Sequence, residues 1–152
     1  MAVRMELSRI LIRELNDMQI IELREAGGDG AEESPTDAAS PNGHKKRTFP
    51  IVIGLPEAQA IERRLKGIAI KRPQTHDLLG NIIKAFGGTL ESITINDLAD
   101  HTFFARLDIR LGDGRVIEVD SRPSDAIALG IANDVPILVE AHVLDAAVNE
   151  QP

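Results

Sequence analysis

One stretch organises the whole chain: residues 120–129 read Asp120-Ser121-Arg122-Pro123-Ser124-Asp125-Ala126-Ile127-Ala128-Leu129. Its apolar part continues to Ala132, which predicts a helix buried on most of its faces, with Ser124 as the N-cap and Pro123 preventing helix upstream. A helix start of this kind attracts anions, and Arg122 adds a positive charge beside it. The stretch therefore predicts a phosphate site, although the same residues also fit a purely structural cap in which Arg122 pairs with a neighbouring group.

Composition restricts the function classes. A chain of 152 residues with 43% hydrophobic content suits one globular domain, and no apolar run approaches the ~20 residues that cross a bilayer. We therefore expect a cytoplasmic protein with no membrane partner. The absence of cysteine excludes disulfides, thiolate catalysis and cysteine-bound zinc, so that a metal would need oxygen or histidine ligands. The absence of Trp and Tyr argues against binding of single strands by base stacking.

The charge is unevenly distributed along the chain. The net charge is −7, yet residues 44–72 hold eight Lys or Arg against two Glu, a local charge of +6. If this segment folds onto one face, it can attract nucleic acid despite the acidic whole, because salt screens distant charges. The alternative is an ordinary solvated helix face.

The N-terminal third reads as strands around a loop. Residues 3–15 and 17–24 are rich in Ile and Leu with interspersed charges, which predicts a β-hairpin that turns at Asn16-Asp17. Residues 25–46 are rich in Gly, Ser and Pro and show no hydrophobic periodicity, so we predict a flexible surface loop. Residues 49–53 predict a further strand, and Pro50 places it at a sheet edge.

Two helices are predicted in the middle of the chain. The first starts with Pro56, ends near Gly67, and buries a stripe formed by Ala58, Ile61, Leu65 and Ile68. The second is capped by Thr75 and ends at Gly87-Gly88. Its apolar residues recur at helical spacing: Leu78, Leu79, Ile82, Ile83 and Phe86.

The remaining pattern predicts an α+β fold, with mixed or antiparallel sheets packed against three main helices. Strands are expected at 89–96, 102–111 and 115–121, with a tight turn at 112–114, and a last strand at 137–139 precedes a short terminal helix at 141–148. Three strands followed by a helix describe both residues 5–67 and residues 89–133. This order suggests an internal β-β-β-α duplication, or a mere recurrence of capping chemistry.

The catalytic inventory consists of carboxylates, histidine, hydroxyls and arginines, since Walker loops, serine-hydrolase elbows and dinucleotide fingerprints are absent. Phosphodiester hydrolysis is compatible with this set, because carboxylates can bind a divalent metal while arginines neutralise phosphate. The candidate catalytic residues are Asp120, Asp125, His76 and Asp77. Asp120 and Asp125 are also candidate ligands of magnesium or manganese. The candidate phosphate-binding residues are Arg72, Thr75, Arg122 and Ser124.

Several segments together resemble the bifunctional nuclease domain family. They are residues 49–54 followed by Glu57-Ala58, then 72–79, 100–105, 120–128 and 136–137. The resemblance spans roughly residues 5–142 and implies a compact, homo-oligomeric α+β domain whose relatives degrade DNA and RNA. Gln74 stands where many members have leucine, Phe104 replaces a usual tyrosine, and the loop at 25–46 is longer than expected. We accordingly expect one domain over 1–152, with its core at about 5–142 and a flexible insertion at 25–46.

Two function classes stay open. The favoured one is a metal-assisted nuclease with DNA and RNA as substrates, and the alternative is a non-catalytic oligomeric module that regulates or binds an anion. The resemblance and the basic segment favour the first, whereas the acidic net charge and the scarcity of aromatic residues favour the second. In either case we expect a homo-oligomer, most simply a dimer, because strands such as residues 3–15 carry apolar residues on both faces.

Overall fold

The structure is a computed structural model that describes residues 1–13, 18–27 and 46–149. The predicted turn at Asn16-Asp17 and most of the predicted loop at 25–46 lie outside these described residues. The described residues form a seven-stranded mixed sheet and four helices, so the predicted α+β class is confirmed.

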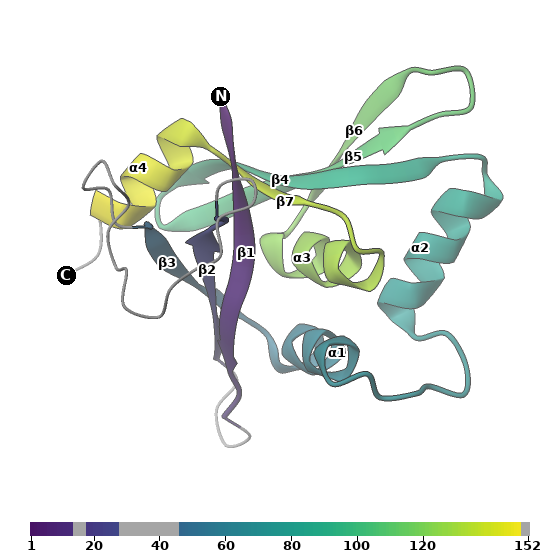
Figure 1. Cartoon of the computed structure of the whole chain (residues 1–152), viewed down its shortest axis with the longest axis horizontal. Helices are drawn as coiled ribbons and strands as arrows, with labels where there is room; N and C mark the ends of the chain where they lie inside the picture. The colour runs from purple at the N-terminus through teal and green to yellow at the C-terminus, as the bar shows by residue number, and fades with distance from the viewer. Residues whose placement is uncertain (14–17, 28–45, 150–152) are drawn as a thin grey trace.

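The sheet joins two meanders through one short strand (Figure 1). Its strands are β1 (Ala2–Leu11), β2 (Gln19–Glu25), β3 (Thr48–Ile53), β4 (Thr89–Ala99), β5 (Thr102–Arg110), β6 (Val116–Ser121) and β7 (Ile137–Glu140). They lie in the order β3-β2-β1-β7-β4-β5-β6, and every neighbouring pair is antiparallel except β4 with β7. β3 therefore lies at an edge, as Pro50 predicts.

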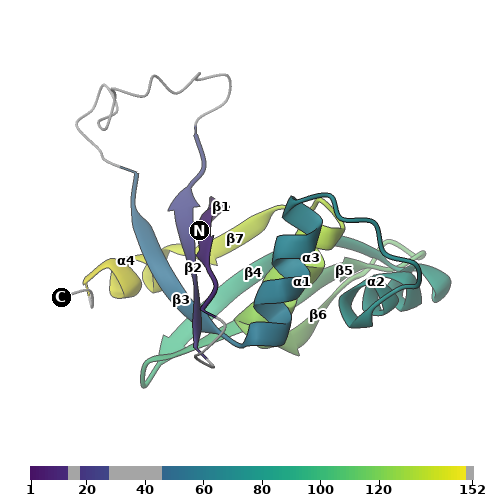
Figure 2. The ribbon, with the colours of Figure 1, turned by 90° about the horizontal axis from the view of Figure 1, so that it is seen from below.

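The helices are α1 (Leu55–Leu65), α2 (Thr75–Ala85), α3 (Pro123–Ala132) and α4 (Ala141–Asn149). Figures 1 and 2 show α1, α2 and α3 grouped together, whereas α4 lies at the far end of the sheet near β3. α3 is the centre of the helical group, because it packs against α1, α2, β4 and β5.

The burial of α3 confirms the prediction from its apolar run. Every residue from Pro123 to Gly130 is buried except Asp125, which is half-buried. A side chain on Gly130 would press on Ile93 of β4, because an added Cβ would lie 3.3 Å from that side chain. The predicted cap is wrong by two residues: Arg122 is the N-cap and Pro123 is the first helical residue, where its missing N–H costs nothing.

The other two helices differ from the predictions in their exposed residues. α1 buries Ala58 and Ile61, but it ends at Leu65, so that Leu65 and Ile68 are exposed rather than part of a buried stripe. The N-cap of α2 is Gln74, not Thr75. The outer face of α2 exposes four large apolar side chains, those of Leu78, Leu79, Ile82 and Phe86, and Phe86 is 87% exposed.

The order β-β-β-α occurs twice, as predicted, but a duplication is not shown. The first meander contacts β7 through β1 in antiparallel pairing, whereas the second contacts β7 through β4 in parallel pairing. The two units are thus not equivalent about the strand that joins them. In the described part of the chain, no helix is long and apolar enough to span a membrane.

Candidate functional site

The start of α3 holds a charged cluster. Because Pro123 fixes the first helical residue, Arg122 and Asp125 lie one turn apart on the same side of the helix. Arg122 Nε donates to Oδ2 of Asp125 at 2.9 Å, and Arg122 Nη2 donates to Oε1 of Glu57 at 3.0 Å. One guanidinium therefore bridges carboxylates of α3 and α1.

His76 completes this arrangement from α2. Its Nε2 lies 3.0 Å from Oδ1 of Asp125, and its side chain is only 13% exposed. The packing of α2 against α3 brings these two residues together although 49 positions separate them in the sequence. Each oxygen of Asp125 thus has its own partner, and we call Glu57, His76, Arg122 and Asp125 the arginine cluster.

Electrostatics keep Asp125 and Arg122 ionised. Partial burial opposes the charge on Asp125, but the hydrogen bonds from Arg122 and His76 outweigh burial and hold the pKa of this carboxyl below its usual value. The hydrogen bond to Asp125, followed by the contacts with Glu57, raises the pKa of the Arg122 guanidinium. Asp125 is therefore an acceptor-only carboxylate that fixes the arginine and the imidazole.

Glu57 is the cluster member that sequence reasoning missed as a site residue. It lies in the first turn of α1, where an acidic residue ordinarily complements the helix dipole, so its position alone gave no functional signal. Its side chain is only 12% exposed, which is unusual for a glutamate. Gly54 makes room for it, since a Cβ at that position would lie 2.5 Å from Oε2 of Glu57.

Two cavities flank the cluster. The smaller, about 250 Å³, lies between α1, the connector that follows it and the start of α2, and His76 contributes to its wall. The other, about 490 Å³, lies between β3, the β4–β5 turn and the start of α3, and Arg122, His101 and Ser124 line it. His76 thus lines one cavity and Arg122 the other.

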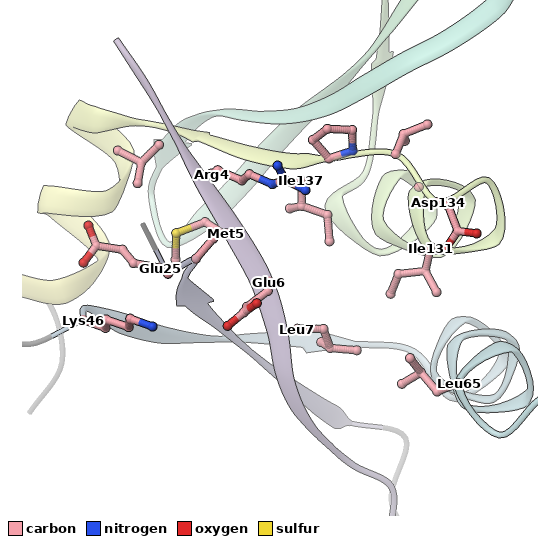
Figure 3. Close-up of a pocket in the computed structure, with 16 residues that line it drawn as sticks. Arg4, Met5, Glu6, Leu7, Glu25, Lys46, Leu65, Ile131, Asp134 and Ile137 are labelled. Carbon is pink, nitrogen blue, oxygen red and sulfur yellow. The ribbon is translucent and has the colours of Figure 1, made fainter. Parts of the chain in front are cut away.

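A third hollow lies away from the cluster. It is an open groove of about 980 Å³ along β1, and none of its lining residues belongs to the arginine cluster (Figure 3). Its polar lining mixes Arg4, Glu6, Glu25, Lys46 and Asp134. This alternation of positive and negative side chains gives the groove no single charge that would select a phosphate.

Three other predicted residues lie in the first turns of α2 and α3, and they divide into two roles. Oδ2 of Asp77 accepts a hydrogen bond from the backbone N–H of Gln74 at 3.0 Å, so Asp77 caps the helix. Thr75 is exposed at the rim of the smaller cavity, and Ser124 of α3 is 7% exposed in the other. The geometry gives Asp77 a structural contact and leaves both hydroxyls beside the cavities.

Asp120 lies away from Asp125. In the pairing of β5 with β6, Asp120 is opposite Arg106, whose side chain points towards Glu118 and Glu140. The adjacent residue, Ala105, is fully buried on the sheet face that α3 covers. Side chains alternate between the two faces of a strand, so Asp120 is on the face opposite the helical group. Asp120 and Asp125 are therefore close in sequence but do not share a site.

The described residues do not fit a divalent metal held by Asp120 and Asp125. No three His, Asp or Glu side chains are grouped as metal ligands within residues 1–13, 18–27 and 46–149. Both oxygens of Asp125 already accept hydrogen bonds, and Asp120 faces away. Dependence on magnesium or manganese stays a prediction. Arg72 is exposed in the connector before α2, and within the described residues its side chain has no bond to the cluster.

The sequence is similar to that of a known protein family. The sequence profile of the bifunctional nuclease domain matches residues 41–151. Two uncharacterized proteins of Mycobacterium tuberculosis, from strains CDC 1551 / Oshkosh and H37Rv, are each 36% identical to this chain over 138 residues. Each alignment covers 91% of this chain and 71% of the relative. All four residues of the arginine cluster lie within the range that the profile matches.

Proposed function

The chain belongs to the bifunctional nuclease domain family, as the resemblance of its motifs predicts, and from this premise we propose that it hydrolyses phosphodiester bonds of DNA and RNA. The observation that carries the proposal is the arginine cluster, which joins an exposed cation to an oriented imidazole. A phosphodiesterase needs both, because one neutralises the phosphate and the other moves a proton.

Arg122 is the proposed phosphate ligand. A guanidinium has five N–H donors, and Arg122 uses Nε and one Nη2 hydrogen in its bonds to Asp125 and Glu57. The three remaining donors belong to a side chain that is 67% exposed and lines the larger of the two flanking cavities. The carboxylates thus fix the plane of the guanidinium while its outer edge stays available to a phosphate.

His76 is the proposed general base. With ionised Asp125 on Nε2, the neutral imidazole carries its proton on Nε2 and presents Nδ1 as an acceptor. Water is the nucleophile that DNA and RNA have in common, since DNA lacks a 2′-hydroxyl. Nδ1 takes a proton from this water as its oxygen bonds to phosphorus. The P–O bond to the leaving ester oxygen breaks as that oxygen takes a proton from solvent water, and the imidazolium then returns its proton to solvent.

The decisive experiment compares two His–Asp pairs of this chain. Wild type, Asp125→Asn and His76→Ala are incubated with plasmid DNA and with single-stranded RNA, in magnesium, manganese or chelator. The matched controls are Asp97→Asn and His142→Ala, which alter an exposed pair with an Nε2 to Oδ1 distance of 3.9 Å on β4 and α4. We expect the cluster variants to lose about 100- to 10,000-fold in rate and the controls to match wild type.

Two outcomes would contradict this proposal. Equal cleavage by every variant would indicate a contaminating nuclease or a misplaced site. No cleavage by wild type under any metal condition would favour the alternative, a non-catalytic module that regulates or binds an anion. The observation that favours this alternative is that Glu57 and Asp125 already neutralise Arg122, as in a structural ion-pair network.

We also propose that the protein is a homodimer formed through the outer face of α2. The support is that Leu78, Leu79, Ile82 and Phe86 are exposed together on one helix, although an amphipathic helix ordinarily buries such a face. Light scattering should give twice the chain mass of 16.5 kDa. Phe86→Glu should return the mass to that of one chain, whereas Val52→Glu, at an exposed apolar position on β3, should leave the dimer intact.

A further inference from the structure

The end of α1 and the connector after it carry cations that the protein itself does not neutralise. Among the residues that the structure describes, the side chains of Arg63, Lys71 and Arg72 have no ion pair, and Arg64 reaches only exposed Asp134 at 3.7 Å. Most other arginines are paired with a carboxylate: Arg9, Arg47, Arg106, Arg110, Arg115 and Arg122. A group of unpaired cations can bind the phosphates of a nucleic acid, which releases the counterions around them.

Two of these cations line the smaller cavity beside the cluster, and the other two belong to a connector that contributes to its wall. Arg63 and Arg64 line it directly, and the connector that carries Lys71 and Arg72 forms its outer wall through Ile68 and Ile70. Its volume of about 250 Å³ lies below the about 300–1,000 Å³ of typical small-molecule pockets. The remaining lining is aliphatic, except for the amides of Gln59 and Gln74 and for the polar residues at the start of α2.

This lining matches the parts of one nucleotide. Aliphatic walls and guanidinium planes accept the faces of a base, amide groups hydrogen-bond to its edge, and the cations at the rim suit its phosphates. A base in a duplex is stacked and paired, so it can enter such a cavity only after it is flipped out. A single strand presents its bases without that cost.

We propose that the smaller cavity holds one base of a single-stranded nucleic acid, with the adjacent phosphates on Arg63, Lys71 and Arg72. This inference rests on the proposed function, since it names the substrate form and the binding track of the same site. His76 belongs to both the cavity wall and the arginine cluster, so a strand held here has its backbone beside the catalytic imidazole. Aliphatic and guanidinium surfaces replace the Trp and Tyr platforms that the sequence lacks.

The opposite face of the sheet disfavours a nucleic-acid track on that side. Asp108, Glu118, Asp120 and Glu140 surround Arg106 on that face, so its local charge is negative. Phosphates are repelled there and attracted on the helical side. The basic segment predicted at 44–72 does not form one continuous basic surface. Arg47 pairs with Glu25 of β2 and Asp145 of α4, whereas the cations of the connector lie beyond the end of α1.

The first test measures binding and its dependence on salt. Fluorescence anisotropy follows a labelled single-stranded oligonucleotide of about 12 nucleotides, within the about 4–16 that such sites cover. The variant is Arg63→Gln/Arg72→Gln, and the matched control Arg9→Gln/Arg115→Gln removes the same charge elsewhere. The slope of log affinity against log salt is negative, and each lost phosphate contact reduces its magnitude by about 0.7. The slope of the variant should therefore be about 1.4 smaller in magnitude than that of wild type, and the slope of the control should be unchanged. Equal slopes for the two double variants would overturn the proposal.

The second test fills the cavity. Ala60→Phe places an aromatic ring in it, and Ala146→Phe makes the same change at a half-buried alanine of α4. Ala60→Phe should weaken single-strand binding by about 5- to 100-fold, the value of one bound base, without weakening binding of the matching duplex. Melting temperatures check that both variants fold. Unchanged single-strand affinity in a folded Ala60→Phe protein would overturn the proposal, as would binding of phosphatidylserine vesicles instead of the oligonucleotide.

Failure of this inference is distinct from failure of the proposed function, because binding is read without cleavage. Single-strand binding that is lost in the two variants, with no cleavage by wild type, would support the cavity and reject the nuclease. Cleavage by wild type with an unchanged KM in Arg63→Gln/Arg72→Gln would support the nuclease and reject the track.

Discussion

The starts of α2 and α3 look alike in sequence and differ in what they hold. Each has an Arg-Pro pair at or shortly before its first residue, and both have an aspartate at the third helical position, Asp77 in α2 and Asp125 in α3. Arg122 precedes its aspartate by three positions and binds it, whereas Arg72 precedes Asp77 by five and does not. Asp77 instead caps the backbone of its own helix. The arginine of α2 is thus two positions farther from its aspartate, and this aspartate caps the helix instead of binding the arginine.

The strongest test of this comparison exchanges the two arginines for glutamine. Arg122→Gln should lower kcat by about 100- to 1,000-fold, because it removes the donors that are proposed to bind the phosphate. Arg72→Gln should leave kcat unchanged and raise KM by up to about fivefold, the worth of one exposed charge contact. Single-turnover and steady-state cleavage assays separate the two effects.

The control for Arg122→Gln addresses folding. Glu57 is mostly buried, so the single variant leaves its charge without a partner, and Arg122→Gln/Glu57→Gln removes both charges. A double variant that melts like wild type and still lacks activity would assign the loss to chemistry. Equal losses of kcat in Arg72→Gln and Arg122→Gln would contradict the difference between the two helix starts.

The two helices also differ in burial, which a pair of isoleucine truncations can measure. Ile127→Ala in α3 removes a fully buried side chain and should lower the free energy of unfolding by about 2–5 kcal/mol. Ile82→Ala in α2 truncates an exposed side chain and should change the stability of one isolated chain by no more than about 0.5 kcal/mol. Urea titrations give both values.

Protein concentration extends this test to the proposed dimer. If the outer face of α2 joins two chains, the cost of Ile82→Ala should rise with protein concentration, because association stabilises the folded state by mass action. The cost of Ile127→Ala should not. A large, concentration-independent cost for Ile82→Ala would mean that α2 packs more tightly on its own chain than its exposure indicates.

Local sequence patterns located most elements of the fold. The Gly112–Gly114 turn, the edge strand with Pro50 and the buried helix at α3 all follow from residues that are close in sequence. The apolar stripe of α2 was equally visible, but a stripe shows only that a helix has a hydrophobic face. What covers that face depends on tertiary or quaternary packing, so the exposure of Leu78 and Phe86 was not predictable.

The contacts within the candidate site were predictable only between residues that are close in sequence. Arg122 and Asp125 are one helical turn apart, and both were predicted as site residues. His76 was predicted as well, but its contact with Asp125 depends on the packing of α2 on α3, and that of Glu57 with Arg122 spans 65 positions. Asp120 was placed beside Asp125 because the sequence does not say which sheet face the helices cover. Its strand position puts it on the other face.

The lowered pKa of Asp125 predicts a smaller effect at acid pH. A carboxyl whose pKa is lower in the folded than in the unfolded state stabilises the fold above its unfolded pKa, near about 3.9, and loses this contribution as the pH falls through the folded pKa. The difference in unfolding free energy between wild type and Asp125→Asn should therefore be constant above about pH 5 and shrink below about pH 4. Urea titrations at pH values from about 3 to about 6 measure it, and a difference independent of pH would contradict the ion-pair interpretation.

The smallest expected effect is that of substitutions at Asp77. They test whether the aspartate at the third position of α2 caps its helix or takes part in catalysis. Because its carboxylate accepts the Gln74 backbone N–H, Asp77→Ala should lower the free energy of unfolding by about 1 kcal/mol, the usual worth of such a bond. It should leave kcat unchanged at temperatures where the variant is folded, whereas Asp125→Asn should not. Asp77→Asn is the matched control, since its side-chain oxygen can still accept the bond and should restore part of the stability. If Asp77→Asn were as stable as wild type but inactive, Asp77 would act in the chemistry, and the two helix starts would be functionally alike after all.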